Sequence, residues 1–486
     1  MKVRKISKNL IAVLLSFVLV IFLLDTVTVR TNAITHRELE DLTIEIPDGS
    51  RYTVKTIHYS YSNNRYVSLR DMAFALKGTA KHFGLSVGST EINIKTGSGY
   101  ESAGGENTGF AEGEYTTEGI KINPITIDDR KCRYYTFLGN NTEGVRDAFI
   151  SITDLAMILD SDLKIDPESG IIKMSDGDFY IDMQEYEAQG LYYEVYSAIV
   201  GDATTGTVYS AYNENASVSA ASTTKLMTYL CIMDAVSDGE VSLDDNVTIS
   251  GNAAAISQTS DGVIKMNEGQ SALLSDMMYA ILLPSSNEAA LAVAEHIDGS
   301  EEEFVKRMNL KARELNLSEA TFFYNCHGLP EYSDTVAASK IQNRISAYDM
   351  FVLSGHILNK YPEIKEITTT QKYKLDAFGV EVENTNPLLY NLPGVVGLKT
   401  GTTNAAGASL VSAYDFDDGS SVHTIVAVEY GAEDATVRNT VSEILIRYGI
   451  QCMEDVPQKG KEEEAGFPLS YEDLLKRIVL NKSRRR

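Results

Sequence analysis

Cysteine and histidine are scarce in this chain of 486 residues, and their scarcity excludes several kinds of site. Neither the four cysteines nor the seven histidines form a C-x-x-C pair, an H-E-x-x-H motif or another metal-ligand pattern. We therefore expect no metal and no other cofactor. We expect the cysteines to be buried free thiols, with disulfide pairing as the alternative. They are Cys132, Cys231, Cys326 and Cys452.

Positive charge is also in short supply. Lysine and arginine number 43 against 68 aspartates and glutamates, which gives a formal net charge of −25. Because nucleic acids are bound through clustered lysine and arginine side chains, this balance argues against nucleic acid as a partner. A local cationic pocket can still exist within an acidic protein.

Long apolar runs are absent except near the N-terminus. The run Leu10–Leu24 follows a basic segment, residues 2–8, and precedes small residues near Ala33. This pattern is typical of a signal peptide, residues 1–33, and predicts an exported, extracytoplasmic protein. The alternative is an uncleaved anchor, but the run is shorter than the roughly 20 residues of a spanning helix.

Two segments before residue 190 repeat one pattern. "RYVSLRDMAFAL" begins at Arg65 and "AFISITDLAMIL" at Ala148, and a short alternating strand follows each. The repeat unit is therefore strand, short helix, strand, with Ser68 and Ser151 placed to cap the helices. We expect a small α/β repeat domain over residues 40–182.

A different pattern begins after a predicted linker at residues 182–194. A hairpin around an Asp-Ala-Thr-Thr-Gly turn comes first, a mostly helical stretch follows, and strands return from "GVVGLKTG" onward before a last helix. Residues 190–450 are thus expected to form one sheet flanked by helices, plus a helical subdomain. A cleft between sheet and subdomain is a natural site.

The remaining residues, 451–486, form a charged C-terminal tail. Its end, "YEDLLKRIVLNKSRRR", has the pattern of a short amphipathic basic helix, which would allow weak contact with a membrane surface. A solvated tail is the favoured interpretation, because the apolar stripe covers barely two turns.

Three short polar motifs occur in order within the second region: S-x-x-K from Ser222 to Lys225, S-x-N from Ser285 to Asn287, and K-T-G from Lys399 to Gly401. Ser222 lies near the start of a predicted helix, so Ser222 and Lys225 share one face of its first turn. A serine hydroxyl becomes a nucleophile when a base takes its proton. An amine can be that base if burial and a nearby cation keep it neutral.

The other two motifs place polar groups where they can face the same cleft. Ser285 falls on a loop between two apolar helices. The K-T-G tripeptide lies on a predicted edge strand, where Lys399 supplies positive charge and Thr400 a hydroxyl. Gly401 allows a substrate backbone to approach closely.

Each motif also occurs elsewhere, so no single match identifies a site. A second K-T-G, Lys95–Gly97, ends a strand of the repeat and needs no chemical role, and further copies begin at Ser62 and Ser161. Ser250-Gly251-Asn252 is the serious alternative to Ser285, because it also follows Ser222. It lies only 28 residues further on, which leaves little room for a helical hairpin between the motifs.

With these motifs in order, residues 190–450 resemble the serine-type D-Ala-D-Ala carboxypeptidases of peptidase family S11, the low-molecular-weight penicillin-binding proteins. The resemblance extends over "AASTTKLMT", "LLPSSNEAALAVAEH" and "GVVGLKTGTTNAAGASLV". In "FYNCHGL", Cys326 stands where the family usually has proline. The N-terminal repeat resembles, more loosely, copper amine oxidase N-terminal-like domains, although no ligand cluster for copper is present.

This resemblance implies an α+β protein with the penicillin-binding/β-lactamase-like transpeptidase fold, in which an antiparallel sheet is flanked by helices. It implies that Ser222 attacks the carbonyl between two terminal D-alanines of a peptidoglycan stem peptide, with Lys225 as the base. Ser285 and Asn287, with Lys399, would relay protons and hold the peptide. β-Lactam antibiotics would be covalent inhibitors.

The family pattern also assigns the residues that bind the substrate. Lys399 and Thr400 would receive the terminal carboxylate, next to Gly401. The backbone N–H groups of Ser222 and Thr402 would form the oxyanion hole, in which each donor typically contributes about 2.7–4 kcal/mol of transition-state stabilisation.

Three alternatives remain open from the sequence. A class A β-lactamase needs a glutamate that activates water, and the only similar segment, Arg313–Asn316, has the wrong spacing. A D,D-endopeptidase or transpeptidase would use the same residues. An inert wall-binding protein is disfavoured because Ser222, Lys225 and Lys399 are all present.

Overall fold

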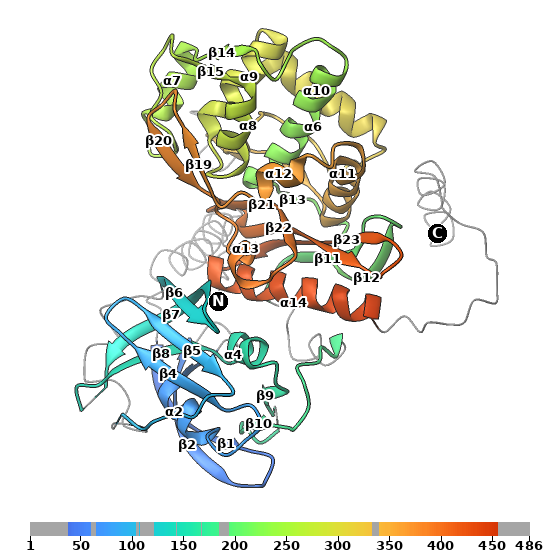
Figure 1. Cartoon of the computed structure of the whole chain (residues 1–486). Helices are drawn as coiled ribbons and strands as arrows, with labels where there is room; N and C mark the ends of the chain where they lie inside the picture. Colours follow the sequence, from blue (N-terminus) through green and yellow to red (C-terminus); the bar gives the residue numbers. More distant parts are fainter. Residues whose placement is uncertain are drawn as a thin grey trace, which may run out of the picture.

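The computed structural model describes residues 37–59, 65–103, 106, 121–141, 143–166, 168–183, 194–332 and 340–454 (Figure 1). The predicted signal peptide, most of the predicted linker and the S-x-N copy at Ser62 lie outside these ranges. Among the helices of the described ranges, none has both the length and the apolarity needed to cross a membrane.

A sheet of ten strands occupies the N-terminal part of the described chain, in the order β4-β5-β6-β7-β8-β3-β2-β1-β10-β9 (Figure 1). The strands are β1 (Arg37–Glu45), β2 (Arg51–Tyr59), β3 (Arg65–Ser68), β4 (Phe83–Val87), β5 (Ile92–Thr96), β6 (Lys121–Ile127), β7 (Arg130–Asn140), β8 (Arg146–Ser151), β9 (Leu163–Ile165) and β10 (Ile172–Met174). Two short helices, α2 (Leu69–Ala75) and α4 (Ile152–Leu159), follow β3 and β8.

The internal repeat is visible in this sheet. Ser68 accepts a hydrogen bond from the backbone N–H of Asp71 and Ser151 accepts one from that of Asp154, so both predicted helix caps are confirmed. Each copy is larger than the expected unit of strand, helix and strand. It consists of a hairpin, a single strand, a short helix and a second hairpin. The last strand of each copy pairs in parallel with the first strand of the other copy: β5 pairs with β6, and β10 pairs with β1. The repeat of strands and short helices expected here is, in the structure, a mainly antiparallel sheet with two short helices.

A second sheet has five antiparallel strands in the order β12-β11-β23-β22-β21. They are β11 (Ser197–Asp202), β12 (Thr207–Tyr212), β21 (Val395–Thr403), β22 (Gly407–Asp417) and β23 (Val422–Ala432). The predicted hairpin is the pair β11–β12, and the strand with K-T-G, β21, is an edge strand as predicted. One face is covered by α14 (Ala435–Glu454), which extends beyond the predicted end of the domain at residue 450, so residues 451–454 of the predicted tail are helical.

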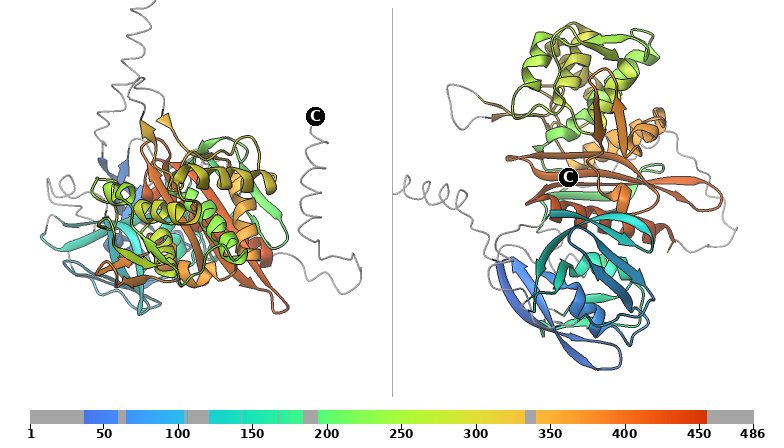
Figure 2. Two further views of the ribbon diagram at one scale, coloured as in Figure 1. Left: turned by 90° about the horizontal axis from the view of Figure 1, so that it is seen from above. Right: turned by 60° about the vertical axis from the view of Figure 1, so that its left-hand side comes forward.

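Helices cover the other face of this sheet and form a subdomain above it (Figures 1 and 2). Apart from α13 (Leu388–Asn391), which packs with α14 on the opposite face, they are α6 (Lys225–Ser237), α7 (Gly251–Ser257), α8 (Leu274–Leu282), α9 (Asn287–Asp298), α10 (Glu301–Glu314), α11 (Ala347–Lys360) and α12 (Ile364–Thr368). Their apolar faces and the upper face of the sheet share one continuous core. The expected α+β architecture, an antiparallel sheet flanked by helices with a helical subdomain, is confirmed.

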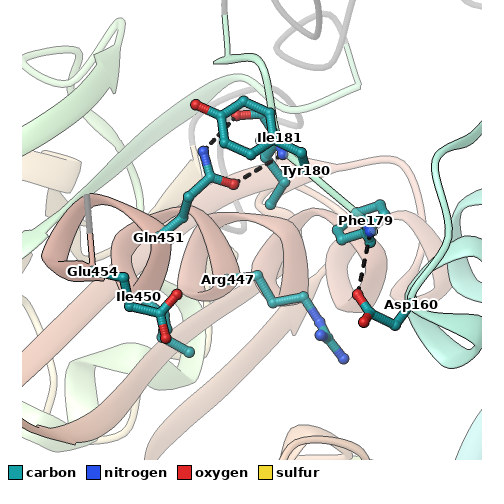
Figure 3. Close-up of a pocket in the computed structure, with 8 residues that line it drawn as sticks. All are labelled: Asp160, Phe179, Tyr180, Ile181, Arg447, Ile450, Gln451 and Glu454. Carbon is teal, nitrogen blue, oxygen red and sulfur yellow. Dashed lines mark hydrogen bonds between the residues drawn. The ribbon is translucent and has the colours of Figure 1, made fainter. Parts of the chain in front are cut away.

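The two sheets meet along α14 and α13 (Figure 2). Gln451 on α14 pairs with the backbone of Ile181 through two hydrogen bonds of 2.9 Å, and Thr440 donates to Asp154 Oδ1 at 3.1 Å. Beside Gln451 lies a pocket of about 260 Å³ that Tyr180 and Arg447 help to line (Figure 3). This pocket lies between the sheets and is separate from the three motifs.

The other copies of the motifs have structural roles. Lys95–Gly97 covers the end of β5 and the turn after it, as predicted. Ser250 caps α7 by accepting a hydrogen bond from the backbone of Ala253, and Lys164 is exposed on β9. None of the four cysteines, all of which lie in the described ranges, forms a disulfide; three are buried as expected, but Cys452 is partly exposed, so the prediction of burial is wrong for that residue.

Candidate active site

Ser222 and Lys225 meet at the start of α6. A single 3-10 turn, η2 (Ala221–Thr224), leads into α6, so Ser222 and Lys225 lie one turn apart. The Nζ atom of Lys225 lies 3.1 Å from Ser222 Oγ. Because Lys225 is completely buried, this contact is shielded from bulk water.

The amine of Lys225 is oriented by two further contacts. Its Nζ donates to Asn287 Oδ1 and to the backbone carbonyl of His327, both at 2.7 Å. A neutral amine has two N–H bonds and one lone pair, so these two acceptors leave the lone pair for Ser222 Oγ–H. Burial lowers the pKa of Lys225 to about 7, which makes the neutral form available near neutral pH.

A neighbouring loop determines the orientation of Asn287. Its Nδ2 donates to the carbonyl of Asp261 at 2.8 Å, which turns Oδ1 toward Lys225. The next residue, Glu288, is fully buried and accepts hydrogen bonds from the backbone of Val263, at 3.0 Å, and of Ile264. The first two residues of α9 therefore hold the loop of Asp261 against the site.

The K-T-G strand borders the same site. A Cβ atom at Gly401 would lie 3.3 Å from Ser222 N and 3.2 Å from Thr223 Cγ2, so β21 packs directly on η2. The close approach at Gly401 is thus made by the turn that carries Ser222, a role that the sequence did not indicate. Thr400 Oγ1 contacts Thr385 Oγ1 at 2.6 Å.

Lys399 is the second buried lysine of the site. Its Nζ donates to the carbonyl of Thr400 at 3.0 Å. Burial, with the positive charges of Lys225 and Arg438, holds the pKa of Lys399 well below its usual value. A bound anion would offset this repulsion and favour the charged form of Lys399.

Ser285 lies between α8 and α9 as predicted, but its hydroxyl is not engaged. Its backbone is left-handed, with a φ of 71°, and Ser285 Oγ is buried without a hydrogen-bond partner among the described residues. Thr402 is on β21, and its hydroxyl donates to the carbonyl of Gly401 at 2.8 Å. All eight predicted site residues therefore lie on η2, α6, the α8–α9 loop, α9 or β21.

Sequence reasoning missed two groups in the segment "FYNCHGL". The ring of His327 is uncharged near neutral pH, because burial lowers its pKa to about 3. The backbone carbonyl of His327, however, contacts Lys225. Gly328 has a φ of +93°, and a Cβ there would lie 1.9 Å from the carbonyl oxygen of Ala221. Two residues that follow Cys326 thus support the turn that carries Ser222.

Replacing Gly328 by alanine is expected to disrupt the site. The added Cβ would push η2 away from its position, and misplacement of a nucleophile by about 1 Å can cost on the order of 10²-fold in rate. If β-lactams acylate Ser222, as the family resemblance implies, we expect that acylation to slow by at least about that factor, measured by stopped-flow fluorescence.

The matched control is Gly379→Ala. Gly379 also has a positive φ, +66°, but a Cβ there would meet nothing within 4 Å. It therefore carries the backbone strain without the collision. If both variants acylate equally fast, the proposed contact between Gly328 and η2 has no catalytic importance.

Comparison with known proteins agrees with this geometry. The model of the D-alanyl-D-alanine carboxypeptidase family, Peptidase_S11, matches residues 184–428. The chain is 35% identical over 252 residues to D-alanyl-D-alanine carboxypeptidase DacF of Bacillus subtilis, a match that covers 51% of this chain and 60% of that protein. It is 32% identical over 260 residues to DacD of Escherichia coli, covering 52% of this chain and 63% of that protein. The chain therefore spans less than two thirds of the length of these relatives.

Among solved structures, penicillin-binding protein 6B from Escherichia coli is similar over 53% of this chain and 77% of that one. The TM-score is 0.47 and the sequence identity 30%. The N-terminal ten-stranded sheet precedes the segment that the family model matches.

Proposed function

The chain belongs to the D-alanyl-D-alanine carboxypeptidase family, Peptidase S11, and from this premise we propose that it is a serine carboxypeptidase acting on peptidoglycan stem peptides. The reaction would remove the terminal D-alanine from a peptide that ends in D-Ala-D-Ala. The observation that carries the proposal is the position of Lys225 Nζ, 3.1 Å from Ser222 Oγ with both N–H groups directed at carbonyl oxygens.

Acylation follows from this arrangement. Ser222 Oγ attacks the carbonyl carbon of the penultimate D-alanine while its proton passes to Lys225 Nζ. The C–N bond to the terminal D-alanine then breaks, and the proton is delivered to the leaving nitrogen. Ser285, whose buried hydroxyl has no partner among the described residues, is the proposed relay for that proton.

Deacylation reverses the roles. Water attacks the ester carbonyl, Lys225 takes the proton of the water, and the C–O bond to Ser222 breaks as Oγ regains a proton. The backbone N–H groups of Ser222 and Thr402 are the proposed donors to the oxyanion in both steps.

The terminal carboxylate is proposed to bind at Lys399 and Thr400. The charges that act on Lys399 most strongly are those of Lys225 and Arg438, both positive, so a carboxylate supplies the missing opposite charge. Thr400 offers a hydroxyl on the same strand. This arrangement favours a substrate with a free C-terminus over an internal peptide bond.

Location and partners are part of the same proposal. We propose that residues 1–33 direct export and that the enzyme acts outside the cytoplasm, at the wall or the outer face of the membrane. β-Lactams are proposed to acylate Ser222 as analogues of D-Ala-D-Ala. The ten-stranded sheet is proposed to be a separate N-terminal domain, similar to copper amine oxidase N-terminal-like domains.

The test is product analysis with the full-length protein. We expect one D-alanine to be released from each pentapeptide ending in D-Ala-D-Ala, detected by mass spectrometry. Cleavage of cross-linked muropeptides without release of terminal D-alanine would assign an endopeptidase instead. Rapid repeated turnover of nitrocefin would assign a β-lactamase, and absence of all three activities would contradict an enzymatic role.

A further inference from the structure

We propose that the N-terminal sheet positions the strand that binds the substrate carboxylate, with Asn391 and Arg133 as positioning residues. The role of β21 in carboxylate binding rests on the function proposed above; the contacts themselves do not. Arg133 lies on β7, before the segment that the family model matches, so the family likeness assigns it no role.

Asn391 joins the two parts of the molecule. It is the last residue of α13 and is buried. Its Oδ1 accepts a hydrogen bond from the backbone N–H of Arg133 at 2.8 Å, and its Nδ2 donates to the carbonyl of Arg133 at 2.9 Å. This reciprocal pair satisfies both backbone groups of Arg133, as a neighbouring strand would, and it fixes the direction of the Asn391 side chain.

Two arginine side chains of β7 reinforce the junction. The guanidinium of Arg133 lies 3.9 Å from the centre of the Tyr390 ring and forms an ion pair of 3.4 Å with Glu383. Arg130 donates to the backbone carbonyl of Asn391 at 2.6 Å. Cations stacked on aromatic rings and charge-assisted hydrogen bonds are among the stronger surface contacts.

The segment of residues 383–391 also contacts β21, on the side away from β7. Thr385 contacts the hydroxyl of Thr400 at 2.6 Å, and Asn386 donates to the carbonyl of Gly397 at 3.1 Å. Thr385 also donates to the carbonyl of Leu283, two residues before Ser285, at 3.2 Å. Residues 383–391 therefore lie between β7 on one side and the K-T-G strand on the other.

This segment needs an external support. The helix α13 has only four residues, and a helix of one turn is not stable by itself, because nucleation costs more than its few hydrogen bonds return. By contrast, β7 is tied into the ten-stranded sheet, paired with β6 over its residues 130–136 and with β8 over its residues 136–140. The rigid partner therefore belongs to the N-terminal domain, and the segment it holds determines where Thr385 meets Thr400.

The test compares Asn391→Ala and Arg133→Ala in the full-length protein, with Lys131→Ala, an exposed residue of the same strand, as control. We expect kcat/KM for a peptide ending in D-Ala-D-Ala to fall by about three- to tenfold in the first two variants, the range of a lost hydrogen bond. Hydrolysis of the acyl-enzyme should slow less than acylation, because the carboxylate has left with D-alanine and β21 then contributes only the Thr402 N–H. Lys131→Ala should match the wild type in both steps.

Hydrogen–deuterium exchange provides a second measurement that does not need activity. We expect amides of residues 383–403 to exchange faster in Asn391→Ala and Arg133→Ala than in the wild type and in Lys131→Ala. Unchanged exchange there, or unchanged kcat/KM in an active enzyme, overturns the proposal. If the wild type releases no D-alanine, the proposed function fails, and the exchange measurement alone decides whether the N-terminal sheet holds β21.

Discussion

Covalent labelling by a fluorescent penicillin is expected to disappear when Ser222 is replaced by alanine. Ser222 Oγ is the only atom of that side chain able to form the ester, and Lys225 Nζ lies 3.1 Å from it. Without the hydroxyl, no acyl-enzyme can form, whatever the affinity for the antibiotic. Fluorescence of the denatured protein on a gel, where only covalent adducts survive, measures the loss.

Ser250→Ala is the matched control for this experiment. Ser250 begins the rival S-x-N copy, and its side chain caps α7 through the backbone N–H of Ala253. Its replacement is expected to cost about 0.5–2 kcal/mol of stability, as for other helix caps, and to leave labelling intact. Labelling that persists in Ser222→Ala would show that another residue is the nucleophile.

Replacing Lys225 by alanine is expected to slow acylation of Ser222 by about 10²–10⁴-fold, the usual contribution of a positioned general base. The amine is held by Asn287 Oδ1 and the carbonyl of His327, and these acceptors direct its lone pair at Ser222. The second-order rate constant for acylation by penicillin, with folding checked by circular dichroism, measures the effect. Lys164→Ala, in the other S-x-x-K copy, should acylate at the wild-type rate.

The pH dependence of acylation provides an independent check on Lys225. Because burial lowers its pKa to about 7, the base is protonated below that pH and free above it. We therefore expect kcat/KM to rise through pH 7 and then level off. A rate that continued to climb toward pH 10, near the ordinary pKa of lysine of about 10.4, would mean that Lys225 stays charged in the free enzyme.

Several features of the fold and of the site were predictable because they depend on residues close together in the chain. The spacing of Ser222 and Lys225 places both on one helical turn wherever the helix lies. Likewise, Ser68 and Ser151 cap their helices through backbone groups three residues away. The order of the three motifs also distinguished the K-T-G of β21 from the copy at Lys95–Gly97. Only the K-T-G of β21 follows the predicted nucleophile and base in the chain.

Other features could not be predicted because they join residues far apart in the chain. The carbonyl of His327 belongs to the backbone, and every residue has one. Its contact with Lys225 therefore cannot be recognised from the type of residue at that position. The crossing of hairpins between the two repeats is set by the pairing of β5 with β6 and of β10 with β1. The pairing of Asn391 with Arg133 depends in the same way on how two sheets pack.

The amino-acid sequence by itself determined which groups can do chemistry, since a hydroxyl, an amine and a K-T-G strand are properties of residue type and local spacing. Tertiary structure alone decided that Lys225 is buried, which is why its pKa falls to about 7 and a lysine can act as a base. The physical reason is that protonation depends on the surroundings of a group, and the surroundings of Lys225 include Asn287 and His327, which lie 62 and 102 residues away in the chain.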